Sequence, residues 1–198
     1  MATGCSTLAH VRGEAAGCRA CPLWADATQT VFGEGPVDAR VVLVGEQPGD
    51  REDIDGHPFV GPAGRVLDQA LEAAQIDRSA VFTTNAVKHF KYRRRGKRRI
   101  HQRPSAAEMT ACRKWLELEL DLVRPEVTVA MGATAAHAMF GRATPIGANR
   151  GRLLESPLFG VPVIVTAHPS SVLRERDADA RHAAIEALTS DFGLVHEV

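Results

Sequence analysis

The sequence predicts an α/β fold, a three-layer α/β/α sandwich with a central four-stranded parallel sheet. Short apolar runs alternate along the chain with stretches whose apolar residues recur at helical spacing. This alternation is typical of a parallel sheet that helices cover on both faces. Polar motifs follow three of the apolar runs, and open α/β sheets bind ligands at the carboxyl ends of their strands. The expected strands are 40–45, 81–87, 127–131 and 161–167.

The first three helices are predicted from apolar spacing and from caps. A short helix is expected around 8–16. Apolar residues at helical spacing over 66–74 indicate a second helix, which follows the glycines of PFVGPAGR. Ser105 and Glu108 have the spacing of a capping box that opens a third, longer helix. Pro125 ends this helix, because proline cannot continue the helical hydrogen bonds.

The remaining helices have weaker signals. Gly132 directly follows the third expected strand and opens a helix of small residues, which stops near Gly141. A final helix over 185–192 shows apolar residues on one side. Residues 142–160 have no clear periodicity and are expected to be irregular.

Length and composition indicate one intracellular domain. The 198 residues are 44% hydrophobic and 24% charged, which suits a single well-cored domain over 1–198. The chain starts with MATGCSTLAH, which lacks the pattern of a signal peptide. No apolar run approaches the roughly 20 residues that span a bilayer. We therefore expect an intracellular protein whose four cysteines are reduced or metal-bound.

The most unusual stretch is 88–105, KHFKYRRRGKRRIHQRPS, in which seven of the nine positions from 91 to 99 are Lys or Arg. Such a run repels itself, so we do not expect it to form a folded element of its own. Lys and Arg bind phosphates with release of condensed counterions, so the run could contact nucleic acid. The alternative interpretation is a solvated loop without a binding function. The 24 basic and 24 acidic residues balance overall, so we favour a focused contact with nucleic acid.

A metal site is indicated by Cys18 and Cys21, whose C-x-x-C spacing lets two thiolates meet one metal centre. A thioredoxin-like redox motif is the rival, but that motif belongs early in a βαβ unit, and here the pair precedes the first strand. Cys112 is a candidate third ligand, although a small buried hydrophobe is the alternative for it. The fourth ligand could be Cys5 or His89. Spacing alone does not separate a zinc site from an iron–sulfur cluster.

Four motifs follow one another along the chain behind the early C-x-x-C. They are GEQPGD at 45–50, PFVGPAGR at 58–65, TNAVKH at 84–89 and HPSSVLR at 168–174. In this order they closely resemble the iron–sulfur uracil-DNA glycosylases of family four. The resemblance runs from Cys18 to the final helix and implies the fold and the uracil-excising activity of that family.

Two departures from the family-four pattern match a narrower group, the UdgX-type proteins. His89 stands where the family usually has a cysteine ligand, and the segment 96–105, GKRRIHQRPS, is inserted. UdgX-type proteins become covalently joined to uracil-containing DNA through a histidine of the KRRIH loop, which is His101 here. The resemblance also implies a [4Fe–4S] cluster and leaves Cys5 free. The implied cluster ligands are Cys18, Cys21, His89 and Cys112.

An enzyme that excises a base must hold that base outside the stack. The resemblance selects Phe59 for stacking on uracil, where core packing would otherwise be the default. The Asn85 amide has a donor and an acceptor, so it can match the O4 and N3–H edge of uracil. Cytosine presents the reverse pattern and would leave polar groups unpaired. The backbone around Gln47 is expected to contribute a further donor to the substrate.

Breaking the C1′–N1 bond leaves negative charge on uracil and positive charge on the sugar. His168 is expected to donate to uracil O2, with a structural helix cap as its alternative. Glu46 is expected to stabilise the sugar cation and to accept a proton from the attacking group. His101 is expected to take the place of the attacking water and to form a bond to C1′. The residues expected to hold backbone phosphates are Lys97, Arg98 and Arg99.

Three functions remain open on these residues. The first is a covalent, single-turnover trap for uracil-containing DNA, and the second is a uracil-DNA glycosylase that turns over. The third is a non-catalytic, metal-containing module that binds nucleic acid. We favour the first because KRRIH is inserted. We expect its partner to be uracil-containing DNA with single strands accepted, and we expect a monomer located at the nucleoid.

Overall fold

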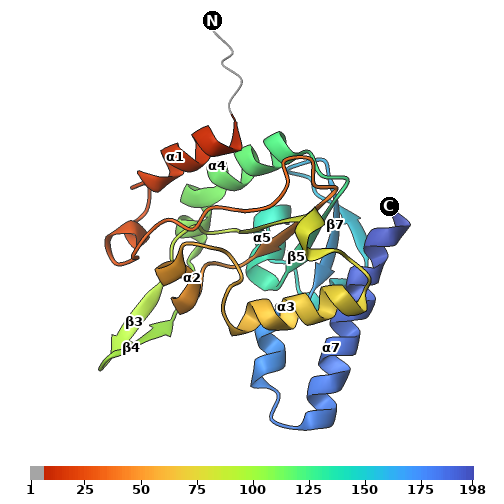
Figure 1. Ribbon diagram of the computed structural model, residues 1–198. Coiled ribbons are helices and arrows are strands. Elements are labelled where there is room, and N and C mark those ends of the chain that lie inside the picture. Colours follow the sequence, from red (N-terminus) through yellow and green to blue (C-terminus); the bar gives the residue numbers. More distant parts are fainter. Residues whose placement is uncertain (1–6) are drawn as a thin grey trace, which may run out of the picture.

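In the computed structural model, which describes residues 7–198, helices cover both faces of one five-stranded sheet (Figure 1). Four strands run parallel, and a short edge strand runs antiparallel to its neighbour. The predicted three-layer fold with four parallel strands is therefore confirmed. In sheet order the strands are β2 (Val81–Asn85), β1 (Val41–Gly45), β5 (Val127–Met131), β7 (Pro162–Thr166) and β6 (Leu153–Glu155).

The two faces of the sheet form separate apolar cores because side chains alternate along each strand. Leu43 of β1 faces α3 (Pro62–Ala73) and α7 (Ala178–Gly193). Its neighbours Val42 and Val44 face α4 (Ala106–Val123) and α5 (Ala133–Phe140). All strands that are covered on both faces are apolar almost throughout, as expected for a parallel sheet. The edge at which these strands end is thereby held between two rigid layers.

A third, smaller core joins the start of the described chain to α4. The helix α1 (Leu8–Ala16) packs against α4 through Val11 and Ala15, next to Cys112 and Trp115. Among the helices of residues 7–198, none is long and apolar enough to cross a membrane. The short helical elements are α2 (Asp50–Asp55), α6 (Ile146–Asn149), η1 (Pro22–Ala25), η2 (Arg78–Ala80), η3 (Pro169–Arg174) and η4 (Leu194–Glu197).

The helix caps follow the sequence. The Ser105 hydroxyl accepts from the Glu108 amide, and the Glu108 carboxylate accepts from the Ser105 amide at 2.6 Å, so the predicted capping box opens α4. The helix ends at Arg124, which adopts φ +53° directly before Pro125. In contrast, the expectation that 142–160 is irregular was wrong, because α6 and β6 lie there. Elements of four and three residues are too short to show a period.

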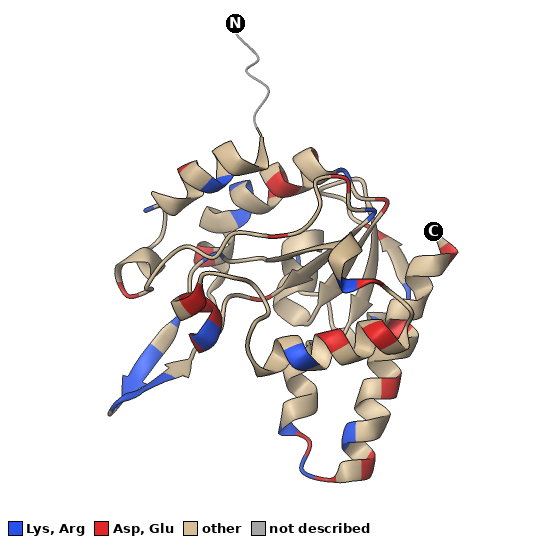
Figure 2. Ribbon diagram, viewed as in Figure 1, with Lys and Arg blue, Asp and Glu red and all other residues tan. Residues whose placement is uncertain are grey.

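The basic run does form a folded element, contrary to the expectation from its charge. Strands β3 (Tyr92–Arg95) and β4 (Arg98–His101) pair in an antiparallel hairpin. It projects from the body of the molecule as an arm rich in Lys and Arg (Figure 2). Gly96, at φ +60°, supplies the left-handed conformation that the two-residue turn needs. The repulsion is reduced because the Arg99 guanidinium binds the carboxylates of Asp50 and Asp53, each at 2.5 Å.

Candidate active site

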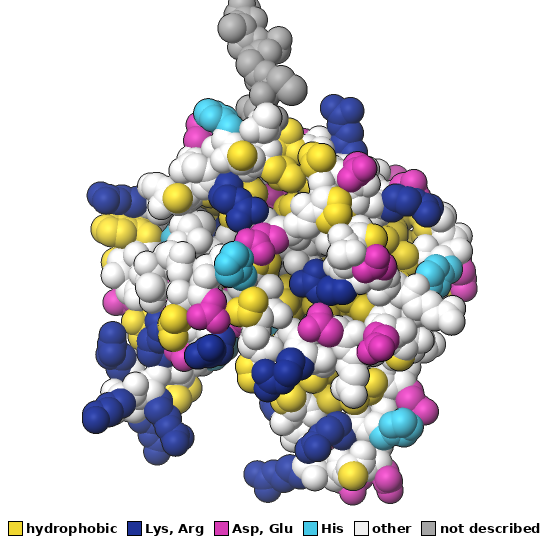
Figure 3. Space-filling model, in the orientation of Figure 1, with side chains coloured by type: hydrophobic (Ala, Val, Ile, Leu, Met, Phe, Trp, Pro, Cys, Tyr) yellow, Lys and Arg dark blue, Asp and Glu magenta, His cyan; other side chains and the backbone are white. Residues whose placement is uncertain are grey.

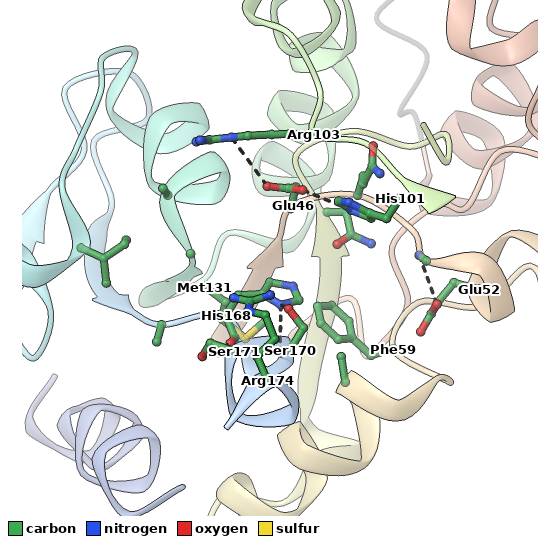
Figure 4. A pocket seen from close by; sticks show the side chains of 18 residues that line it. Glu46, Glu52, Phe59, His101, Arg103, Met131, His168, Ser170, Ser171 and Arg174 are labelled. Atoms are coloured by element: carbon green, nitrogen blue, oxygen red, sulfur yellow. Dashed lines mark hydrogen bonds and ion pairs between the residues drawn. The ribbon is translucent and has the colours of Figure 1, made fainter. Parts of the chain in front are cut away.

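One cavity of about 680 Å³ lies at the carboxyl edge of the sheet (Figure 4). Its walls come from the ends of β1, β2, β5 and β7 and from the hairpin β3–β4. Parallel strands end at the same edge, so residues far apart in the chain meet there. The cavity gathers all six residues predicted for base binding and catalysis, although their chemical roles stay predictions. They are Glu46, Gln47, Phe59, Asn85, His101 and His168.

Asn85 and Phe59 close over Gly45, which pairs with Asn85 in the β1–β2 register. A Cβ on Gly45 would lie 2.3 Å from Asn85 Oδ1 and 2.6 Å from Phe59 Cζ, so the arrangement requires glycine. Phe59 has φ +58°, a conformation that costs a bulky residue energy and is typical of functional sites. Within residues 7–198, the Asn85 side-chain amide has no hydrogen-bond partner, although Asn85 is only 3% exposed. It is therefore available to a ligand in the cavity.

His168 presents an N–H to the cavity. Its Nδ1 accepts the backbone N–H of Ser170 at 3.1 Å, and a backbone amide can only donate. Nδ1 therefore carries no proton, and in the neutral ring the proton is on Nε2. Burial lowers the pKa of His168 to about 4, and Glu46 only partly opposes this effect. The ring stacks on Phe59 with 6.2 Å between centroids. His168 thus combines the expected donor with the cap of η3.

Glu46 lies between three polar side chains, of which Figure 4 shows His101 and Arg103. Its Oε1 is 3.3 Å from His101 Nε2. Its Oε2 accepts the Thr134 hydroxyl proton and lies 4.0 Å from Arg103 Nε. Burial raises the pKa of Glu46, but hydrogen bonds from His101 and Thr134, with the charges of His101 and His168, outweigh burial and leave the pKa below its usual value. The group is therefore a carboxylate at neutral pH.

Gln47 holds the base of the hairpin. Its Nε2 donates to the carbonyls of Lys91 and Gln102, both at 3.1 Å, and its Oε1 accepts the Lys91 amide at 3.2 Å. The Gln102 amide closes the same base by donating to the Lys91 carbonyl. The Gln47 side chain is therefore occupied, and only its backbone is left for the predicted substrate contact. Since Gln47 follows Glu46 directly, this clamp also sets the position of His101 relative to Glu46.

The three residues predicted to bind phosphates differ in their surroundings. Lys97 and Arg98 are exposed at the turn of the hairpin. Arg99 is not free, because Asp50, Asp53 and the Thr28 hydroxyl take up its guanidinium. Sequence reasoning missed these partners, since both aspartates lie almost 50 positions earlier. Dark blue side chains gather at this corner of the surface (Figure 3), where the exposed basic residues of the hairpin are Arg93, Arg94, Arg95, Lys97 and Arg98.

Two residues that contact Glu46 were not selected from the sequence. Thr134 begins α5 just after β5, and Arg103 follows the hairpin. A signal was present for Thr134, because β5 was the one predicted parallel strand from whose end no residue had been chosen. Arg103 had no comparable signal. Its role depends on a side-chain contact with Thr134 at 3.2 Å.

A buried ion pair lies beneath Asn85. Lys88 Nζ donates to Glu119 Oε2 at 2.6 Å, to Thr84 Oγ1 at 2.6 Å and to the Asn85 carbonyl at 2.8 Å. Both side chains are at most 1% exposed. Glu119 also accepts the Gly33 amide at 2.8 Å. Because each ammonium proton has an acceptor, the pair can persist without water. It fixes the turn that carries Asn85 against α4.

The three cysteines expected to bind metal lie together in the small core beside α1. Cys18 and Cys21 pack against Cys112 and Trp115. Burial raises the pKa of Cys112 to about 11, so a thiolate there needs positive charge nearby. The Lys88 amide already points at its sulfur, with N and Sγ 3.2 Å apart. Trp115 Nε1 is buried without a partner among the described residues. A donor and an orphaned N–H beside three thiols suit a sulfur-rich inorganic group.

The His89 ring also has the tautomer that a metal ligand needs. The Thr30 hydroxyl donates its proton to the Ala15 carbonyl, and Thr30 Oγ1 lies 2.9 Å from His89 Nε2. His89 Nε2 must therefore donate to Thr30, which leaves the lone pair of Nδ1 for a metal. Within 7–198, no three His, Cys, Asp or Glu side chains gather around a single ion. Cys5 lies outside the described residues.

Fold and cavity together define an α/β protein whose ligand-sized cavity lies at the carboxyl edge of its sheet. A profile of the uracil DNA glycosylase superfamily matches residues 32–192. The chain belongs to this superfamily. It is 39% identical to a type-4 uracil-DNA glycosylase of Thermotoga maritima over 170 residues. This match covers 85% of this chain and 84% of the relative. A type-4 uracil-DNA glycosylase of Archaeoglobus fulgidus is 35% identical over 187 residues, 91% of this chain and 87% of the relative. The predicted resemblance to family four is confirmed.

Proposed function

We propose that this protein excises uracil from DNA and becomes covalently joined to the sugar C1′ through His101. The observation that carries the proposal is the position of His101 inside the cavity, with its Nε2 3.3 Å from the Glu46 carboxylate. Strand β4, which belongs to the inserted segment 96–105, ends at His101. A water molecule would need the same place beside the carboxylate to act as the nucleophile. The imidazole therefore competes directly with hydrolysis.

Uracil recognition is assigned to Asn85 and Phe59. The unpaired Asn85 amide can donate to uracil O4 and accept from N3–H. The Phe59 ring lies beside it and offers a stacking face in a narrow site. Cytosine would place a donor against the Asn85 donor, which leaves polar groups unpaired and lowers affinity. The buried ion pair of Lys88 supports this assignment, because it fixes the backbone of Asn85.

His168 is assigned to the leaving group. As the C1′–N1 bond breaks, its electron pair leaves with uracil, and negative charge develops on O2. The Nε2–H of a neutral His168 can donate to that oxygen, and a donor already aimed at the charge needs no reorganisation. The low pKa of about 4 keeps the ring neutral, so His168 stabilises the anion without transferring a proton to it.

Covalent capture follows from the neighbouring histidine. The lone pair of a neutral imidazole nitrogen of His101 forms a bond to C1′ while the bond to N1 breaks. The ring then carries a positive charge and loses its N–H proton to Glu46, which passes it to solvent, and the uracil anion takes up a proton from solvent. The products are free uracil and a C–N bond between DNA and protein. No good leaving group remains, so the protein acts once.

DNA binding is assigned to the hairpin. Lys97 and Arg98 are exposed at its turn and would neutralise backbone phosphates. Arg99 would act differently, because its ion pairs with Asp50 and Asp53 hold the hairpin to the body. We expect single-stranded substrates to be accepted, since an unpaired base needs no extrusion from a duplex. The protein would act on intracellular DNA, at the nucleoid, as a monomer.

A [4Fe–4S] cluster is proposed on Cys18, Cys21, His89 and Cys112. When bound, it would link the C-x-x-C segment to α4 and to the turn after β2. The Lys88 amide would donate to the Cys112 thiolate, and Thr30 would hold the His89 ring. We assign the cluster a structural role, because none of the cavity residues reaches the cysteines.

A glycosylase that turns over is the second candidate, and the names of the type-4 relatives favour it. The His101 side chain is 50% exposed, which leaves a path by which water could reach Glu46. In this case the hairpin would only hold DNA. Uracil would still be released, but the protein would leave an abasic site and dissociate.

A denaturing gel separates these functions. The purified protein and its His101→Ser variant are mixed with a single-stranded oligonucleotide that contains one uracil, and both are boiled in detergent. We expect a shifted, heat-stable band for the wild type and none for the variant. Alkali-labile abasic DNA without a shifted band in the wild type would indicate turnover instead. Intact uracil in both samples would leave only a non-catalytic binding module. The same oligonucleotide with thymine is the control.

A further inference from the structure

We propose that Thr134 is a positioning residue, which aims the Glu46 carboxylate at His101 and at the sugar of a bound nucleotide. The inference deepens the proposed function and rests on it, since that function gives Glu46 its task. Thr134 lies at the start of α5, and its side chain is buried, with the residue 1% exposed. It thus approaches Glu46 from the helical layer, opposite the hairpin.

The direction of the hydrogen bonds around Thr134 can be derived. A threonine hydroxyl has one proton to donate and lone pairs to accept. Arg103 Nε can only donate, and it lies 3.2 Å from Thr134 Oγ1. Thr134 accepts there, so its own proton is free for Glu46 Oε2, the oxygen with which it makes a short contact. The hydroxyl therefore accepts a hydrogen bond from Arg103 and donates one to Glu46.

These two hydrogen bonds orient the Glu46 carboxylate. Thr134 holds Glu46 Oε2. Oε1 remains directed at His101 Nε2, the contact that a dashed line marks in Figure 4. Arg103 is a competitor, because its guanidinium lies 4.0 Å from Oε2 and its side chain is 62% exposed. Without the hydroxyl, Glu46 would be free to pair with Arg103 and turn away from His101. Thr134 prevents this because its hydroxyl is hydrogen-bonded to both Glu46 and Arg103.

The hydroxyl also affects the charge of Glu46. The titratable and charged groups that face the carboxylate are His101 from β4, Arg103 from the segment after the hairpin and His168 from the segment after β7. Thr134 adds a hydrogen bond to the ionised form, which lowers the pKa of Glu46. Removal of that bond raises this pKa. A rate that needs the carboxylate would then fall away at higher pH than in the wild type.

The test compares Thr134→Val, which keeps the shape but removes the hydroxyl, with Thr134→Ser, which keeps the hydroxyl. Uracil release is measured in a single turnover with protein in excess over uracil-containing DNA. We expect Thr134→Val to slow release by a factor of about 10 or more, as for loss of a hydrogen bond to a charged group. Thr134→Ser should stay within about threefold of the wild type, and only the valine variant should have its acid limb moved to higher pH. Equal rates and limbs in both variants would overturn the inference.

A double-mutant cycle with Glu46→Ala separates positioning from general damage to the cavity. If Thr134 acts through Glu46, Thr134→Val should not slow the residual release by Glu46→Ala any further. An additional loss of the same factor would mean that Thr134 supports the fold and not the carboxylate. Failure of the proposed function looks different, because the wild type itself would then form no adduct with DNA or would release no uracil. Loss of this inference alone leaves the wild type active.

Discussion

At the scale of single residues, two backbone amides and one hydroxyl determine the chemistry of the cavity. The Ser170 amide fixes the tautomer of His168, and the Lys91 amide is held by Gln47 at the base of the hairpin. The Thr134 hydroxyl orients Glu46. Each of these groups acts by holding a neighbouring side chain in place, because all three are already hydrogen-bonded within the protein. The cavity side chains proposed to react are therefore held in place before a ligand binds.

The depressed pKa of His168 predicts a dependence of stability on pH. The unfolded chain binds a proton at this histidine below about pH 6.5, whereas the folded protein binds it only below about 4. The contribution of the neutral ring is therefore complete above pH 6.5 and is lost as the pH falls toward 4. It amounts to about 2 kcal/mol, reduced for the partial exposure of the ring.

His168→Gln cannot be protonated and should lose less stability over this range. Urea unfolding at pH 7 and pH 4.5 measures the difference. We expect the free energy of unfolding to fall more in the wild type than in the variant. Burial also lowers the pKa of His89, so the variant should keep part of the dependence. Parallel curves for the two proteins would contradict the assignment.

Which site residues could be predicted depended on the kind of signal they have. Glu46, Asn85 and His168 stand at strand ends, and topology alone brings strand ends together. His101 was found because a resemblance drew attention to its loop. The partners of Glu46 were missed, since a hydrogen bond between Thr134 and a residue 88 positions away leaves no local pattern. Gln47 was found, but the use of its side chain as a clamp was not.

At the scale of elements, the hairpin shows why charge counting within a run can mislead. The repulsion among its basic residues was expected to prevent folding. Arg99 instead reaches α2, where the two aspartates neutralise it, and it also lies over the rings of Phe90 and Tyr92 at 5.4 and 5.2 Å. Lys91 is paired with Glu108 at 2.9 Å, and the other basic residues of the run are exposed to solvent. A run can therefore fold when one member is anchored elsewhere.

The anchored Arg99 and the exposed residues Lys97 and Arg98 should respond differently to mutation. The double variant Lys97→Ala, Arg98→Ala should weaken binding to DNA with and without uracil alike. The slope of log affinity against log salt should fall by about 1 for each phosphate that the variant no longer neutralises. Arg99→Ala should instead slow adduct formation at saturating DNA, because the hairpin loses its attachment. A titration at several salt concentrations tests this, and a flatter salt slope for Arg99→Ala than for the tip variant would contradict it.

The buried pair between the turn after β2 and α4 predicts strong coupling. Lys88→Met leaves the Glu119 charge uncompensated, and Glu119→Gln does the same to the Lys88 charge. Each single variant should cost about 3–5 kcal/mol, measured by urea unfolding. The double variant has neither charge, and the side-chain amide oxygen at position 119 can still accept the Gly33 amide. It should therefore be more stable than either single variant, whereas additive losses would exclude the coupling.

At the scale of the whole molecule, apolar runs and helical spacing were enough to predict the layers. The parallel strands are buried, and β1, β5 and β7 are apolar almost throughout, whereas β2 ends in the buried polar residues Thr83, Thr84 and Asn85. Strand β6, helix α6 and helix α2 were missed because each is six residues or fewer. The order of strands in the sheet was also beyond the pattern, since it depends on which crossovers pack together.

The cluster assignment predicts a loss of iron together with a loss of stability. Cys112→Ser should lower the iron bound per protein chain, measured by metal analysis, and lower the melting temperature. The reason is that the C-x-x-C segment at 18–21 would lose the link to α4 that the cluster supplies. Cys5→Ala is the matched control, because it removes the one cysteine outside the ligand set and should keep full iron content. Loss of iron in Cys5→Ala, with retention in His89→Ala, would reverse the choice of the fourth ligand.

The central claim is that the protein acts once, and the count of uracil released per protein chain tests it most directly. A known amount of protein is mixed with a large excess of uracil-containing single-stranded DNA, and free uracil is quantified until release stops. Because His101 lies beside Glu46, where the attacking water would stand, we expect a plateau near one uracil per chain, with the same amount of protein joined to DNA. Release that continues through many uracils per chain, with no protein joined to DNA, would contradict the claim.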